Sequence, residues 1–247
     1  MSATIQLKFG TLALDSTNNI TVSHISEKAT KPVQTTQIPV TDGAIAETAR
    51  IGPKTINIEG DIAGAGYDTL RTNLDALHAG LIGQGLAKLT KDNERYIYCQ
   101  LKDFSYAYDH LTTRATWSVS FIAHFPFWLA ETPTEVTTLA NAINNAGNAP
   151  TRAKIEITAN GAITDACRLD NSANNQSFQY RGTIAAAKKL EVDNRYDTDD
   201  FEVLNDSVDD IANFEGDFIT LNAGDNTLAY TGTAYASIKI TYRNCWY

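Results

Sequence analysis

One run of alternating apolar and polar side chains, residues 116–125, restricts the possible folds more than any other stretch of the chain. Trp117, Val119 and Phe121 fall on one side of an extended backbone, whereas Thr116 and Ser118 fall on the other. Such a period of two predicts a core-facing strand of a mostly antiparallel sheet. Residues 54–62 alternate in the same way, so the first half of the chain is predicted to be mainly β.

A single helix interrupts this β pattern. Tyr67, Leu70, Leu74, Leu77 and Leu81 recur every three or four residues, which places them on one stripe of a helix over residues 67–81. Glycines near the end of this run favour helix termination. We expect the apolar stripe to cover one face of the neighbouring sheet.

Residues 134–150 have the composition of a linker. They contain many Thr, Ala and Asn side chains, and Pro133 and Pro150, which lack amide donors, flank the stretch. We therefore predict an N-terminal β-sandwich or barrel-like domain over residues 1–133, a linker over 134–150 and a C-terminal domain over 151–247. Residues 28–52 contain prolines and only short β-prone pieces, which indicates a functional loop or an arm that leaves its domain.

The second half contains short β-prone pieces separated by turn residues, with no helical period. This spacing indicates an antiparallel sandwich. The pieces are residues 153–158, 178–181, 190–192, 201–204, 218–221, 227–230 and 236–242. The last piece is expected to be an integral strand, because Ile238, Ile240 and Tyr242 repeat at period two.

Composition excludes several classes of partner. The formal net charge is −9, and phosphate binding requires a basic face, so no nucleic-acid partner is expected. No apolar run is long enough to cross a bilayer, so no membrane partner is expected either. Cys99, Cys167 and Cys245 show no pairing pattern, which predicts three reduced thiols in a protein made in a reducing cytosol.

No motif for catalysis, cofactor binding or metal ligation is present. Glu59 and Asp61 share one strand face, a spacing more typical of a solvent face than of an acid–base pair. The acidic residues 193–200 do not match the calcium-loop template, and the histidines His24, His78, His110 and His124 lack metal-ligand spacing. We expect no enzyme activity, no cofactor, no metal and no catalytic residue.

Aromatic side chains leave a carbohydrate-binding function open, because sugars stack on exposed rings. The candidates are Trp128, Tyr180, Tyr196, Tyr235, Trp246 and Tyr247. The same residue types are common in β cores and at subunit contacts, which is the more frequent role. A small hydrolase with carboxylates converging in a cleft is the other alternative.

Several stretches together resemble the distal tail protein family of siphophages. They are the aromatic residues 125–128, the junction at residues 145–150, the hairpin at residues 217–228, and the ending at residues 240–247. Residues 50–52, followed by Ile56, Ile58 and Gly60, are also similar to the first half of that family. The likeness covers nearly the whole chain, and its specificity lies in the order and spacing of motifs that are individually weak.

The resemblance implies a structural virion protein without catalysis. It implies a homohexameric ring, single or as two stacked rings, that is built by the N-terminal domains and carries a galectin-like C-terminal sandwich. The ring would act as a hub that joins the tail tube protein to the tail hub or tail-associated protein, with receptor-binding proteins as further partners. It also implies a location at the phage tail tip, after assembly in the host bacterial cytoplasm. A carbohydrate-binding, receptor-binding tail protein is the alternative function.

Overall fold

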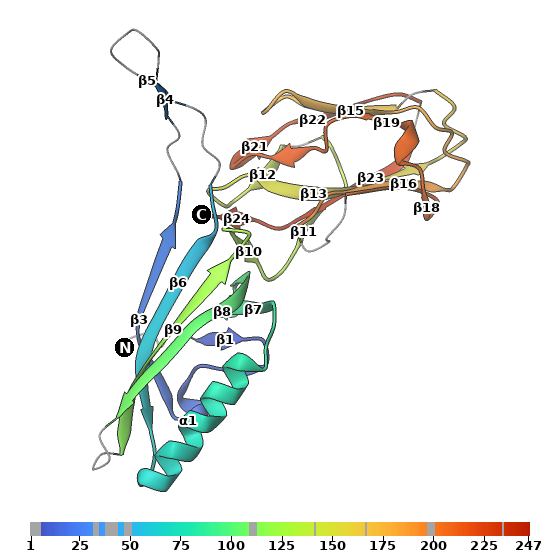
Figure 1. Cartoon of the computed structure of the whole chain (residues 1–247). Helices are drawn as coiled ribbons and strands as arrows, with labels where there is room; N and C mark the ends of the chain where they lie inside the picture. The colour runs from blue at the N-terminus through green and yellow to red at the C-terminus, as the bar shows by residue number, and fades with distance from the viewer. Residues whose placement is uncertain are drawn as a thin grey trace. The chain divides into compact units, whose positions relative to one another are not determined.

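The chain folds into two compact units, residues 1–128 and residues 129–247. The computed structural model describes residues 6–31, 35–37, 44–46, 51–108, 113–140, 142–165, 167–196, 201–233 and 235–247. Each unit is mainly β, and one α-helix lies in the first unit (Figure 1). This is the predicted fold class.

The first unit is built on one large antiparallel sheet. The strands of its main path follow the order β2-β1-β7-β8-β9-β6-β3. Their bounds are β1 Leu7–Phe9, β2 Leu12–Ala13, β3 Ile20–Ala29, β6 Lys54–Ala63, β7 Ala87–Lys91, β8 Arg95–Tyr108 and β9 Arg114–Ala123, with a short 3-10 helix η1 at Ser16–Asn18. Strands β3, β6, β9 and β8 lie side by side as long arrows in Figure 1.

The alternation in β6 and β9 places one apolar row on the core face of this sheet. Ile58 pairs with Val119, and Gly60 pairs with Trp117, so the buried side chains of the two strands meet. A Cβ on Gly60 would lie 2.0 Å from the Thr21 carbonyl oxygen and 3.0 Å from the Trp117 ring. Only glycine therefore allows β3 and the indole to approach this part of β6 so closely.

Helix α1 spans Tyr67–Ile82, close to the range that the leucine spacing predicts. Leu70, Leu74, Leu77 and Leu81 are buried on its sheet-facing side, whereas Tyr67 remains 40% exposed. Each fully buried leucine contributes about 1.5–3 kcal/mol, which makes this stripe a main source of the helix's stability. The helix is therefore stabilised by its packing more than by capping, since Gly66 at its N-cap provides no side-chain hydrogen bond.

The predicted irregular segment, residues 28–52, is partly β. Strand β3 continues to Ala29, and β4 (Thr35–Gln37) pairs antiparallel with β5 (Ala44–Ala46). The amide of Gly52 donates a 2.7 Å hydrogen bond to the Thr30 carbonyl, which closes the segment where it returns to the sheet. Residues 32–34, 38–43 and 47–50 lie outside the described residues. They include Arg50, the first residue of the family motif at residues 50–52.

The second unit is an antiparallel sandwich. Its larger sheet follows the order β11-β23-β13-β16-β17-β18, with β20 also paired to β13, and its other main sheet follows β19-β15-β14-β22. The bounds are β11 Thr134–Val136, β12 Ile143–Asn145, β13 Thr151–Ala159, β14 Cys167–Asn171, β15 Gln176–Tyr180, β16 Lys189–Asp193, β17 Glu202–Asn205, β18 Val208–Asp209, β19 Phe214–Gly216, β20 Thr220–Leu221, β21 Gly224–Asn226, β22 Leu228–Thr231, β23 Tyr235–Tyr242 and β24 Cys245–Trp246, with η2 at Ile211–Asn213. Strand β10, Trp128–Ala130, contains the boundary between the units.

Side chains from both sheets form one core in this sandwich. Ile155, Ile157 and Ile240 come from the larger sheet, and Leu169 and Phe178 come from the smaller one. Strand β23 lies inside the larger sheet, between β11 and β13, as expected for an integral C-terminal strand.

Residues 134–150 do not form the irregular linker that their composition predicts. Strand β11 pairs with β23, and β12 pairs with β21, so the stretch belongs to the C-terminal sandwich. A Cβ on Gly147 would lie 1.8 Å from the Cys245 carbonyl oxygen, which shows how closely the chain packs here. Three-residue edge strands require few amide donors, and asparagine side chains satisfy the groups between them, so the turn-rich composition is compatible with packed structure.

The apolar residues 125–129 also belong mainly to the interior. Trp128 and Leu129 are 5% and 2% exposed, and the rings of Phe125 and Phe127 lie 4.8 Å apart. This apolar run is therefore mainly core.

Candidate assembly interface

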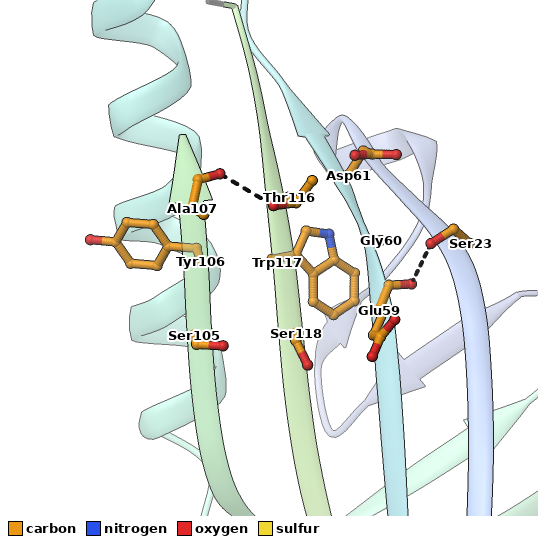
Figure 2. Close-up of a pocket in the computed structure, with 10 residues that line it drawn as sticks. All are labelled: Ser23, Glu59, Gly60, Asp61, Ser105, Tyr106, Ala107, Thr116, Trp117 and Ser118. Atoms are coloured by element: carbon orange, nitrogen blue, oxygen red, sulfur yellow. Dashed lines mark hydrogen bonds between the residues drawn. The ribbon is translucent and has the colours of Figure 1, made fainter. Parts of the chain in front are cut away.

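A groove of about 520 Å³ lies on the open face of the N-terminal sheet (Figure 2). Glu59 and Asp61 line it from β6, together with serine and threonine side chains from β3, β8 and β9. The hydroxyl of Ser23 donates to the Glu59 carbonyl, and that of Thr116 donates to the Ala107 carbonyl. The hydroxyl groups of Ser23 and Thr116 are thus bonded to the backbone, and the groove presents a polar sheet face.

The other polar candidates are dispersed as well. Among the described residues, no three His, Cys, Asp or Glu side chains lie close enough to hold a metal ion. His78 stacks on Phe104 with centroids 5.3 Å apart, His24 and His124 are exposed, and His110 lies outside the described residues. Asp193 pairs with Arg195, whereas residues 197–200 of the same acidic loop are not described. None of the helices in the described part of the chain is long and apolar enough to span a membrane.

The three cysteines, which their spacing predicts to be reduced, are all buried. Burial raises the pKa of the Cys99 thiol to about 12 and that of the Cys167 thiol to about 11. Both thiols therefore remain protonated at neutral pH, which makes them poor nucleophiles and poor metal ligands.

The prominent functional feature is instead a pair of open strand edges in the N-terminal sheet. Strand β3 ends the strand order, and its described pairings are all with β6. Strand β8 extends beyond β7, which pairs only with residues 95–99, and the described register of residues 103–108 of β8 is with β9 (Figure 1). Unpaired edges present rows of N–H and C=O groups that can bind another strand.

Aromatic rings lie along the open edge of β8. Phe104, Tyr106 and Tyr108 are opposite Val119, Trp117 and Ala115, so all three lie on the core face. The ring centroid of Tyr106 lies 5.8 Å from that of Phe104 and 6.0 Å from that of Tyr108. Tyr106 is 46% exposed and Tyr108 is 40% exposed. Half-exposed tyrosines in contact with one another are typical of protein interfaces.

The open edge of β3 carries a matching pattern. Val22 and Ile25 are half-buried on the core face, where they pair with Gly60 and Ile58. The opposite face of this edge is polar, as it is in residues 103–108 of β8, where Ser105 is exposed. Both edges therefore present apolar groups on one side of the sheet and polar groups on the other.

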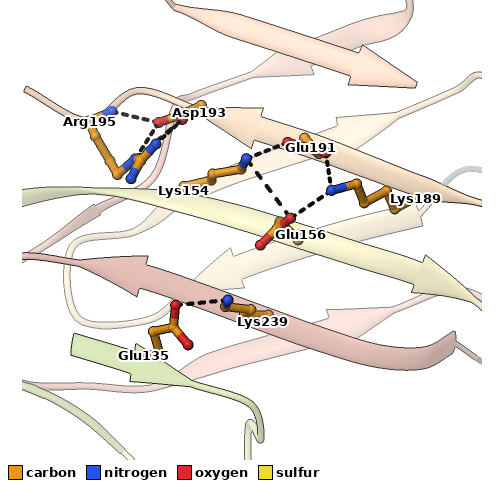
Figure 3. A network of polar contacts seen from close by, with 8 residues as sticks. All are labelled: Glu135, Lys154, Glu156, Lys189, Glu191, Asp193, Arg195 and Lys239. Atoms are coloured by element: carbon orange, nitrogen blue, oxygen red, sulfur yellow. Dashed lines mark hydrogen bonds and ion pairs between the residues drawn. The ribbon is translucent and has the colours of Figure 1, made fainter. Parts of the chain in front are cut away.

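The C-terminal sandwich carries a row of ion pairs on the open face of its larger sheet (Figure 3). Glu191 binds both Lys154 and Lys189, Lys189 lies 3.0 Å from Glu156, and Lys239 lies 2.8 Å from Glu135. Burial alone would raise the pKa of Glu191, but hydrogen bonds from the two lysines outweigh it and hold this pKa below its usual value. These charges compensate one another, so the face attracts neither anions nor cations strongly.

The aromatic residues considered for sugar binding do not form one exposed platform. Tyr180 and Trp128 are buried, and Tyr196 has the Arg152 guanidinium 4.5 Å from its ring centroid. Tyr235 and Trp246 are half-buried, and Tyr247 is 50% exposed. Sugar binding by stacking therefore has little support in the described part of the sandwich.

Two family models match the chain and together cover both units. The phage tail protein RIFT-related domain matches residues 7–123, and the C-terminal domain of the siphovirus-type tail component matches residues 146–246. No curated protein has a matching sequence.

A solved structure shows the same fold. The crystal structure of SPP1 Dit, described as a paradigm of the hub adsorption apparatus in phages that infect Gram-positive bacteria, is similar over 98% of this chain and 99% of that chain. The identity is 15% and the TM-score is 0.75. A chain of the phage P2 baseplate in its activated conformation with Ca matches over 97% of this chain and 98% of its own length, with 10% identity and a TM-score of 0.49.

Two β units, matched by phage tail domains over residues 7–123 and 146–246, define a structural component of phage tails. Both units thus match domains of siphophage tail proteins, in agreement with the resemblance of the chain's motifs to the distal tail protein family. Its role is that of a structural component of a phage tail.

Proposed function

We propose that six copies of this chain close into a ring, single or as two stacked rings, in which β3 of one copy pairs with residues 103–108 of β8 in the next. The number six comes from the family resemblance. The observation that carries the proposal is the presence of two open edges, with matching apolar and polar faces, on opposite sides of one sheet. Different edges on the two sides allow a head-to-tail contact that closes by rotation.

Strand direction supports this pairing. Strands β8, β9, β6 and β3 are successively antiparallel, so β3 runs opposite to β8. Rotation about a ring axis preserves each strand's direction along that axis, so the neighbour's β3 also runs antiparallel to β8. The contact would then extend the existing antiparallel ladder, with Tyr106 and Tyr108 beside β-branched side chains such as Val22 and Ile25. Aromatic and β-branched neighbours stabilise cross-strand contacts.

In the proposed virion, the ring joins the tail tube protein to the tail hub or tail-associated protein and supports receptor-binding proteins. The chain would act without catalysis and would assemble in the host cytoplasm before it becomes part of the tail tip. Its buried free thiols are consistent with synthesis in a reducing compartment. The N-terminal unit is assigned the ring contacts, because both open edges belong to it.

The mass of the full-length protein in solution tests the ring. We expect a species of six or twelve chains of 27.0 kDa each, for one ring or two. Tyr106→Lys should raise the concentration needed for assembly by about tenfold or more, since it places a charge in a contact of hot-spot type. The matched control is Thr69→Lys, at an exposed position of α1.

Fragments test which unit forms the ring. A fragment of residues 1–128 should assemble, and a fragment of residues 129–247 should remain monomeric. A two-chain species as the final state, assembly of Tyr106→Lys at the wild-type concentration, or assembly of the C-terminal fragment alone would show that the proposed contact is wrong.

A further inference from the structure

One carboxylate in the N-terminal unit receives hydrogen bonds from two distant parts of the chain. Glu27 Oε2 lies 3.1 Å from Lys54 Nζ and 2.8 Å from Trp128 Nε1. The Lys54 side chain is only 3% exposed, and Glu27 is 29% exposed. Trp128 is buried as well.

The three residues stand at two structural transitions. Glu27 lies near the end of β3, and Lys54 begins β6, so both flank the place where the 28–52 segment leaves and rejoins the sheet. The register pairs Ala29 with Lys54, and the Gly52 amide bonds to Thr30 beside them. Trp128 is the last residue of the first unit.

The chemistry of the cluster makes it strong. A buried ammonium group is costly unless a charged partner compensates it, and Glu27 provides that charge for Lys54. Hydrogen bonds to charged groups contribute more than neutral ones. Because both donors reach the same oxygen atom, a shift of the carboxylate changes both contacts at once.

We propose that Glu27 couples the place where the 28–52 segment leaves and rejoins the sheet to the end of the first unit at Trp128. Local opening of the backbone at either place then increases local opening at the other. This intramolecular coupling goes beyond the proposed ring and does not depend on it.

Hydrogen exchange measured by mass spectrometry on the full-length protein tests the coupling. Trp128→Phe keeps the aromatic packing but removes the N–H donor, and it should speed exchange of the Gly52 amide, in a peptide of residues 49–58, by about tenfold. Lys54→Met removes the other donor and should speed exchange in residues 126–130 by a similar factor, because coupling between two places is reciprocal. Neither change leaves a buried charge unpaired, since Glu27 is partly exposed.

Two further experiments test whether the coupling acts through the Glu27 carboxylate. Glu59→Ala, on the opposite face of β6, should leave both peptides at wild-type rates. In the double variant Glu27→Ala/Lys54→Met, adding Trp128→Phe should cause no further change at Gly52, because the shared carboxylate is absent. A wild-type rate at Gly52 in Trp128→Phe alone, or an additional effect of Trp128→Phe in the double variant, would overturn the proposal.

Discussion

At the scale of single residues, asparagines stabilise the turns of the C-terminal sandwich. Asn226 is completely buried, and its amide nitrogen donates to the Asn222 carbonyl at 2.9 Å and to the Gly224 carbonyl at 3.0 Å. Its side-chain oxygen accepts from the Asn222 amide at 2.8 Å. A buried polar group is tolerated because its hydrogen bonds are satisfied.

Replacing Asn226 by Asp should destabilise the protein by about 2–4 kcal/mol at pH 7, because a buried carboxylate would face carbonyl oxygens. The same environment should raise the pKa of the introduced carboxyl, so its protonation should restore part of the loss as pH falls toward 4. Urea unfolding at both pH values measures this. Asp225→Asn, at an exposed neighbouring position, is the control, and an equal loss for Asn226→Asp at both pH values would contradict the prediction.

At the scale of elements, the ion pairs across β13 and β16 stabilise the open face of the larger sheet. Glu191 is the centre of this row, because two lysines from neighbouring positions bind it. Its side chain is 10% exposed, so solvent screens these pairs less than surface pairs.

Glu191→Gln should destabilise the protein by about 1–3 kcal/mol at pH 7. Since the folded-state pKa of Glu191 is lowered, its contribution is fully present above the unfolded value near 4.5 and is lost as pH falls through the folded value. The difference between wild type and variant should therefore shrink below about pH 4.5, as measured by urea unfolding at several pH values. Glu215→Gln, in an exposed pair with Arg181, should show a much smaller difference throughout. If the stability difference between wild type and Glu191→Gln is as large at pH 3 as at pH 7, the charge of Glu191 is not the cause of that difference.

At the scale of the whole molecule, the C-terminal unit includes the stretch whose composition is that of a linker. Asn144 accepts a hydrogen bond from the Tyr242 hydroxyl at 2.8 Å, and the buried Asn145 donates to the Ala149 carbonyl at 2.8 Å. Ile143 belongs to the sandwich core.

A fragment that starts at Leu129 should therefore fold cooperatively, whereas one that starts at Ala149 should be less stable by about 3–5 kcal/mol. The shorter fragment loses β11 and β12, the buried Ile143 side chain and one partner of β23. Differential scanning calorimetry and urea unfolding of the two fragments measure this. Equal stability of the two would indicate that residues 129–148 are a linker after all.

Much of the local structure follows from the sequence alone. Period-two alternation predicts β6, β9 and β23, the leucine spacing predicts α1, and the order of motifs indicates the family. These signals are local, because side-chain direction repeats every two residues in a strand and every 3.6 residues in a helix. Strand β14 escaped prediction although Cys167 and Leu169 alternate with polar residues, because the buried Asn171 interrupts the apolar pattern.

Tertiary structure decided which strands lie together and which edges remain open. Lys54 and Trp128 meet at Glu27 from 27 and 101 residues away, and β11 and β12 become strands only because β23 and β21 bind them. The local periodicity of apolar residues does not indicate which distant residues or strands will be in contact. Pairing in a sheet depends on backbone hydrogen bonds, which every residue can accept and every residue except proline can donate, so the choice of partner rests on the packing of the whole core.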